Sequence, residues 1–134
     1  MESHRFNGGK VTVLQHNILL IEYDEVTAIT VKNLYDLQQL NTKLVGGGSY
    51  HTITEFRNGL INLTDEAKKY VAESPKNVKR LSDSLLVDSL AKRIEAEFYL
   101  AFHKPKVKTK VFTDLNKALN WIEQQEMKKK LELV

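Results

Sequence analysis

The chain has 134 residues, of which 42% are hydrophobic and 28% are charged, and its formal net charge is +3. This length and apolar fraction suit one globular domain with an ordinary core. The absence of cysteine excludes disulfides, thiolate metal ligands and thiol nucleophiles, and it suits a reducing compartment. No apolar run has the length of a membrane span and the start lacks the pattern of a signal peptide, so we expect a cytoplasmic protein without membrane insertion.

Two β-rich runs open the predicted fold. Residues 10–15 and 17–23 are rich in β-branched and aliphatic side chains and predict an antiparallel hairpin. Thr30 is then placed to cap a helix whose apolar positions share one face. The glycine-rich segment 46–49 ends this helix, because glycine adopts the left-handed conformation of a helix C-terminus without steric cost.

Strands and helices alternate along the rest of the chain. The expected strands are residues 50–56, 84–88 and 107–112, and the expected helices begin at Thr64, Ser89 and Asp114. The order β-β-α-β-α-β-α-β-α predicts an α/β fold, a single domain over residues 1–134 with a mixed five-stranded sheet covered by helices. We place its core at about residues 10–123 and expect residues 124–134 either to extend the last helix or to fray.

Several short motifs in this order resemble a known family. Glu55-Phe56-Arg57 ends the predicted central strand and Thr64-Asp65-Glu66-Ala67 opens the next helix; "EFYLAFHKP" (97–105), "TKVF" (109–112) and "ALNW" (118–121) complete the pattern. With these motifs the chain resembles STAS domains, the fold of bacterial anti-anti-sigma factors, and is similar to small bacterial proteins described as STAS-like or SpoIIAA-like. The resemblance covers about residues 10–123 and implies a non-enzymatic regulatory or protein-binding module without a cofactor.

Thr64 is the candidate switch. Sigma-regulating STAS proteins carry Asp-Ser-Ser/Thr-Gly at this helix, with a phosphorylated serine; this chain lacks the tetrapeptide, and Thr64 is the nearest hydroxyl by position. A helix cap by itself explains a threonine here, since its oxygen can accept a hydrogen bond from a free amide, worth about 1 kcal/mol. We therefore predict a cap first and phosphorylation as the alternative. Glu55 and Arg57 are predicted to form an ion pair at the carboxyl end of the strand, where α/β folds bind ligands.

The predicted third helix is apolar nearly all round in its last turn. We expect Ile94, Phe98 and Phe102 to face the sheet and Tyr99 and Leu100 to face another surface. That surface is either a protein partner, including a second copy in a homodimer, or the last helix. The preferred function is therefore docking of a protein through the surface near the second and third helices.

Other functions remain as alternatives. A small apolar-ligand or lipid-binding protein is the first, because the wider fold resembles CRAL-TRIO lipid-binding domains. An enzyme that pairs Glu55 with a histidine is the second, although no spacing demands it, and no histidine pair has the spacing of a helical metal site. Nucleic-acid binding is the least favoured, because the alternating lysines 104, 106, 108 and 110 are better explained as protection of an edge strand than as a phosphate strip.

Overall fold

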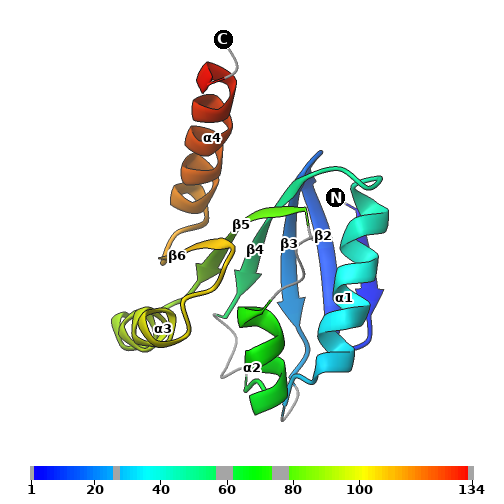
Figure 1. The fold of residues 1–134 in the computed structure, drawn as a ribbon, viewed down its shortest axis with the longest axis vertical. Helices are drawn as coiled ribbons and strands as arrows, with labels where there is room; N and C mark the ends of the chain where they lie inside the picture. Colours follow the sequence, from blue (N-terminus) through cyan, green and yellow to red (C-terminus); the bar gives the residue numbers. More distant parts are fainter. Residues whose placement is uncertain (1, 26–27, 57–61, 74–78, 133–134) are drawn as a thin grey trace.

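The computed structural model describes residues 2–25, 28–56, 62–73 and 79–132, and these ranges form one mixed sheet with helices on both faces (Figure 1). The strands are β1 (Ser3–Phe6), β2 (Gly9–Gln15), β3 (Ile18–Tyr23), β4 (Tyr50–Glu55), β5 (Arg80–Leu86) and β6 (Lys108–Phe112). The helices are α1 (Val31–Leu44), α2 (Asp65–Ala72), α3 (Leu90–His103) and α4 (Leu115–Glu132). The α/β class and the predicted hairpin of β2 and β3 are confirmed.

The sheet has six strands in the order β1-β2-β3-β4-β5-β6, so the prediction of five strands was wrong. The additional strand, β1, pairs antiparallel with β2, and the turn between them is Asn7-Gly8. Gly8 has a φ of +122°, a backbone conformation that glycine adopts without strain. Phe6 at the end of β1 is buried and meets Tyr23 edge-on, with ring centroids 5.9 Å apart. The strand is therefore part of the core.

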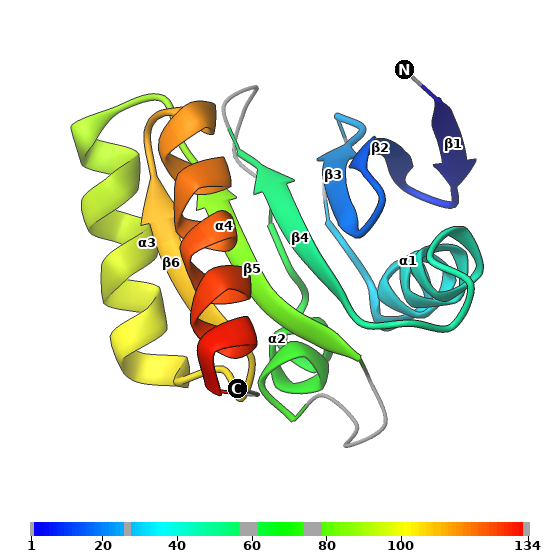
Figure 2. The ribbon, with the colours of Figure 1, turned by 90° about the horizontal axis from the view of Figure 1, so that it is seen from above.

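The order of the parallel strands across the sheet decides on which face the helices lie. Strands β3 to β6 are parallel neighbours in chain order, and α1, α2 and α3 connect them. Because such crossovers are almost always right-handed, three successive ones in one direction place all three helices on the same face. α4 follows β6 and lies across β5 and β6 on the opposite face (Figure 2).

Each face of the sheet has its own hydrophobic core, because successive side chains of a strand point to opposite faces. On β3, Leu19 and Ile21 pack towards Leu37 of α1. Ile18, one position earlier, belongs instead to the cluster that contains Ile122 of α4. The two cores are thus separated by the sheet itself.

The predicted helix starts are confirmed at all four helices. A side-chain oxygen accepts a hydrogen bond from a free backbone amide at Thr30 (from Asn33, 3.2 Å), Thr64 (from Ala67, 3.1 Å), Ser89 (from Lys92, 3.2 Å) and Asp114 (from Asn116, 2.7 Å). α4 continues to Glu132, so residues 124–132 extend the last helix.

One strand is displaced from its expected position. β5 runs from Arg80 to Leu86 rather than over 84–88. Its first half carries three polar residues: Arg80 and Asp83 are half-buried, Ser82 is 0% exposed, and Asp83 accepts two hydrogen bonds from β4. These polar residues conceal the strand in the sequence, and the shift brings Arg80 and Asp83 onto the sheet.

Candidate functional site

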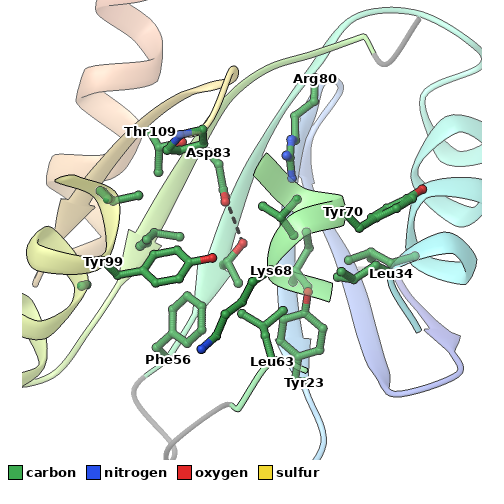
Figure 3. Close-up of a pocket in the computed structure, with 18 of the residues that line it drawn as sticks. Tyr23, Leu34, Phe56, Leu63, Lys68, Tyr70, Arg80, Asp83, Tyr99 and Thr109 are labelled. Carbon is green, nitrogen blue, oxygen red and sulfur yellow. Dashed lines mark hydrogen bonds between the residues drawn. The ribbon is translucent and has the colours of Figure 1, made fainter. Parts of the chain in front are cut away.

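A cleft of about 320 Å³ opens on the sheet face that carries α1, α2 and α3 (Figure 3). β3, β4 and β5 form its floor, α1 and α2 form one wall, and α3 forms the other. The cleft exists because α2 packs against α1 whereas α3 packs against β6, so the middle of the sheet lies between two separate groups of helices. Its volume is at the lower end of small-molecule sites, which occupy roughly 300–1,000 Å³.

Asp83 of β5 lies on the floor of the cleft. Its Oδ1 accepts hydrogen bonds from the hydroxyls of Thr52 and Thr54 on β4, both at 2.9 Å. Figure 3 shows the side chains of Asp83 and Arg80 pointing into the same space from one strand. The two threonine donors fix the position of the carboxylate, so Asp83 is already supplied with hydrogen bonds from within the sheet.

Two other polar groups of the cleft lack hydrogen-bond partners among the described residues. Arg80 Nε is buried and has no hydrogen-bond partner among the described residues. Asn41 of α1 is 3% exposed, and its Oδ1 is likewise without a partner there. Lys68 of α2 extends into the cleft beside Phe56 (Figure 3). The lining therefore offers buried polar atoms that no described residue satisfies.

Tyrosines supply much of the remaining polar lining. Burial raises the pKa of Tyr23, and the nearby charge of Asp83 raises it further. Burial also raises the pKa of Tyr50 and of Tyr99, so all three phenols stay protonated at neutral pH. Tyr70 donates a hydrogen bond to Gln38 Oε1 at 2.7 Å. Serine, cysteine and histidine do not occur among the described lining residues.

The chain matches a known family of proteins. A family model described as a domain of unknown function (DUF7793) matches residues 12–126. The chain belongs to this DUF7793 family. A search among curated proteins found no match.

The fold of this DUF7793 domain is SpoIIAA-like, as the sequence motifs predicted. The chain is similar to the crystal structure of an uncharacterized protein from the DUF3478 family, with a SpoIIAA-like fold, from Shewanella loihica PV-4. The TM-score is 0.58 and the sequence identity is 15%; the match covers 90% of this chain and 98% of that one. At this identity the likeness concerns the fold. Among the described residues, no helix is both long and apolar enough to cross a membrane.

The predicted site residues near α2 fall into three groups. Thr64 is the N-cap of α2, as predicted, and its backbone amide also donates to the carbonyl of Ile29 at 3.0 Å. Glu55 ends β4 and is buried at 6% exposure. Arg57 lies outside the described residues, so the predicted ion pair with Glu55 stays a prediction. Leu63, next to Thr64, lines the cleft, which places the cap at its border.

The predicted orientation of α3 was wrong. Tyr99 and Leu100, which we expected to face a protein partner or the last helix, line the cleft on the sheet side of α3. Ile94, Phe98 and Phe102, which we expected on the sheet, are 59%, 66% and 73% exposed. Both sides of this helix carry large apolar residues, so the 3.6-residue period identifies two apolar stripes but does not say which one packs inward.

A second polar cluster lies on the opposite face of the sheet, under α4. His51 Nδ1 is 2.7 Å from Ser82 Oγ, and His51 Nε2 is 2.5 Å from Glu126 Oε1. The order serine, histidine, carboxylate resembles a catalytic relay, but Ser82 is fully buried, so no substrate can reach its hydroxyl. His51 and Glu55 are four residues apart on β4, about 13 Å in a strand, so His51 is not the partner that the enzyme hypothesis requires. We interpret the cluster as a clamp that holds α4.

Sequence reasoning named Tyr99 but missed other polar residues that give the cleft its character, namely Asn41, Lys68, Arg80, Asp83, Tyr23, Tyr50 and Tyr70. Asn41 lies on the inner side of α1, where a polar residue among leucines marks a break in the apolar stripe. Arg80 and Asp83 were hidden because the strand that carries them was expected to begin later. The break at Asn41 is the one signal that was available in the sequence.

Proposed function

We propose that this DUF7793 domain is a non-enzymatic regulatory module that binds a protein partner through the outer face of α3. The observation that carries the proposal is the exposure of one apolar stripe on this helix. The stripe consists of Leu90 (71% exposed), Ile94 (59%), Phe98 (66%) and Phe102 (73%).

The stripe has the geometry of a docking surface. Its members are spaced by four residues, so they lie above one another on the helix, and Phe98 and Phe102 are in ring contact at 5.2 Å between centroids. Arg93 and Glu97 form an exposed ion pair of 3.1 Å beside it. Large apolar patches bordered by polar groups mark interaction sites, and a partner with an apolar groove or helix face fits this one.

A second copy of the chain is one partner of this kind. Four apolar residues at equal spacing are self-complementary about a two-fold axis, which is what a symmetric dimer requires. In such an antiparallel pair, Leu90 would meet Phe102 of the second copy and Ile94 would meet Phe98. A homodimer is therefore the form of the proposal that can be tested without knowing another protein.

The regulatory part of the proposal concerns Thr64. Its hydroxyl caps α2 at the border of the cleft, and a phosphate there would place negative charge at a helix N-terminus. Asp65 and Glu66 already carry negative charge in the first turn, so the added charge would repel them while it is attracted to the helix dipole. Under these opposing forces the N-cap of α2 would rearrange. Phosphorylation of Thr64 would thereby change the surface around the start of α2.

The test replaces one aromatic residue of the stripe by a charge. Phe98→Asp should abolish self-association in sedimentation experiments, or capture of one specific protein from native lysate. Tyr35→Asp is the matched control, since Tyr35 is an exposed aromatic residue (54%) on another helix, α1. A chain that stays monomeric, with the same captured proteins for both variants, contradicts the proposal.

A small apolar-ligand or lipid-binding function is the second candidate, and the cleft favours it. Its walls carry apolar residues from all three helices on that face, such as Leu34, Val71 and Leu100. Native mass spectrometry of the purified protein tests this function directly: a bound apolar molecule supports it, and a ligand-free protein that takes up none on incubation contradicts it.

A further inference from the structure

Two unsatisfied polar atoms belong to the same cleft. Asn41 Oδ1 and Arg80 Nε are both buried without a hydrogen-bond partner among the described residues, and both residues line the cleft. A buried donor or acceptor without a partner costs about 1–3 kcal/mol, so native structures contain few of them. Two in one cavity indicate that the cavity receives a polar group from outside the chain.

Tyr50 places the two residues at one end of the cleft. Burial raises the pKa of Tyr50, while the charge of Arg80 and a hydrogen bond from the side chain of Asn41 oppose that rise. Both residues therefore act on the same phenol. Because the amide of Asn41 is directed to Tyr50, its carbonyl oxygen is left over, and it remains available to a ligand or to a water held by one.

At the end of the cleft near Tyr50, the group that needs a partner is the positively charged Arg80. Asp83 already accepts hydrogen bonds from Thr52 and Thr54. Arg80, by contrast, makes no ion pair with any carboxylate in the described part of the chain. A guanidinium is always charged at physiological pH and its planar fork matches a carboxylate. An incoming carboxylate would give Arg80 Nε the acceptor that the described residues do not supply.

The rest of the cleft sets the shape of the ligand. Away from Arg80 most of the lining is apolar or aromatic, with Phe56, Leu63 and Val87 among its members, and Lys68 and Glu95 are charged exceptions. A water molecule takes up about 30 Å³ of liquid, so a cleft of about 320 Å³ holds about ten groups of that size. An aliphatic acid of about eight carbons, with two carboxylate oxygens, has this number of non-hydrogen atoms.

We propose that the cleft binds a small amphipathic carboxylate, with the carboxylate on Arg80 and the apolar body between α2 and α3. The proposal deepens the second candidate function, binding of a small apolar ligand, and rests on it. It is independent of the docking surface on the outer face of α3, because the cleft is lined by the opposite side of that helix.

The first experiment compares three ligands of equal chain length on the wild-type protein by isothermal titration calorimetry. Octanoate should bind at least about tenfold more tightly than 1-octanol, as expected for a hydrogen bond to a charged group, and octylammonium should bind more weakly than either. Equal affinities for octanoate and 1-octanol would overturn the carboxylate proposal and leave the apolar-ligand function intact. No binding of any of the three would overturn both.

The second experiment tests Arg80 itself. Arg80→Met should lower the affinity for octanoate about tenfold or more and leave that for 1-octanol unchanged. Arg93→Met is the matched control: it removes the same charge from an exposed position of α3 that is paired with Glu97, and it should change neither affinity. An equal loss for both ligands in Arg80→Met, or no loss for octanoate, would overturn the assignment of the carboxylate to Arg80.

Two further measurements keep the test valid if Arg80→Met folds poorly. In the wild-type protein, the NMR resonance of the Arg80 Nε–H group should shift with octanoate and not with 1-octanol; a resonance that does not move with octanoate would overturn the proposal. Phe98→Asp should bind octanoate as the wild type does. A loss of octanoate binding in that variant would overturn the proposal by placing the ligand on the outer stripe of α3.

Discussion

His51 on β4 and Glu126 on α4 are 75 residues apart in the chain, and His51 Nε2 lies 2.5 Å from Glu126 Oε1. The histidine is almost completely buried, whereas the glutamate is partly exposed at the edge of the helix. On its other side the ring contacts Ser82 Oγ of β5. In the neutral ring Nε2 donates to the carboxylate, and Nδ1 then accepts from the serine hydroxyl. This chain of two hydrogen bonds joins α4 to two strands of the sheet.

We expect the stability of the domain to depend on the ionisation of Glu126. The hydrogen bond from His51 lowers the pKa of Glu126 below its ordinary value of 4.5. A carboxylate with a lowered pKa in the folded state stabilises the fold above the unfolded-state pKa, and this stabilisation is lost as the pH falls through the folded-state value. Glu126→Gln should therefore cost about 1 kcal/mol at pH 7 and flatten the loss of stability as the pH falls below the ordinary glutamate value of 4.5.

Urea unfolding at a series of pH values measures this effect. Glu123→Gln is the control, because Glu123 is an exposed glutamate on the same helix. If both variants follow the pH dependence of the wild type, Glu126 does not hold α4 in the way described.

Removal of the hydroxyl should affect stability differently at the two buried serines of β5, Ser82 and Ser84. Ser82→Ala leaves His51 Nδ1 buried without its partner, which should lower the free energy of unfolding by about 1–3 kcal/mol. Ser84 is also fully buried, but its Oγ has no hydrogen-bond partner among the described residues. Ser84→Ala should thus be neutral or slightly stabilising. Chemical denaturation of the two variants distinguishes these outcomes, and an equal loss in both would contradict the clamp.

Thr64 variants can separate the helix cap from a charge effect. Thr64→Ala removes the acceptor for the amide of Ala67 and should cost about 1 kcal/mol of stability. Aspartate is itself a good N-cap residue, so Thr64→Asp should retain the stability of the wild type while adding a negative charge. Thermal unfolding of both variants tests the cap. If Thr64→Asp also changes partner capture without a change in stability, charge at this position acts on the surface and not on the fold.

Gly9 is expected to tolerate no side chain. A Cβ at this position would lie 2.3 Å from the backbone oxygen of Glu22, and backbone cannot move aside without loss of the β2–β3 pairing. Gly9→Ala should therefore lower stability strongly, by about 2 kcal/mol or more. At Gly48 the nearest atom to an added Cβ is 3.5 Å away, so Gly48→Ala should change little. Similar melting temperatures for the two variants would contradict the close approach of β2 and β3 at Gly9.

Local signals predicted much of this fold. Thr30, Thr64, Ser89 and Asp114 are all N-caps as expected, because a cap depends on a few neighbouring residues that the sequence shows directly. β1 was missed although Asn7-Gly8 is a strong hairpin signal, since the core was expected to begin at about residue 10.

Local signals in the sequence did not predict the cleft. Whether Tyr99 or Phe98 faces the sheet depends on how α3 rotates against β6, and both sides of the helix are apolar. Asp83 looks like a loop residue until Thr52 and Thr54, about thirty positions earlier, supply its hydrogen bonds. Such long-range contacts decide the site, and one sequence does not display them.

The position of α4 in the chain sets the order in which the domain can be completed during translation. By the time β6 has left the ribosome, the three crossover helices are available to cover their face of the sheet, but the opposite face still exposes Ile18, Ile53 and Leu86. That face is closed only when Ala118 and Ile122 follow. The nascent chain therefore passes through a stage in which one face of the sheet is covered by helices and the other exposes its apolar residues. A chaperone that shields apolar strands would act during the synthesis of α4.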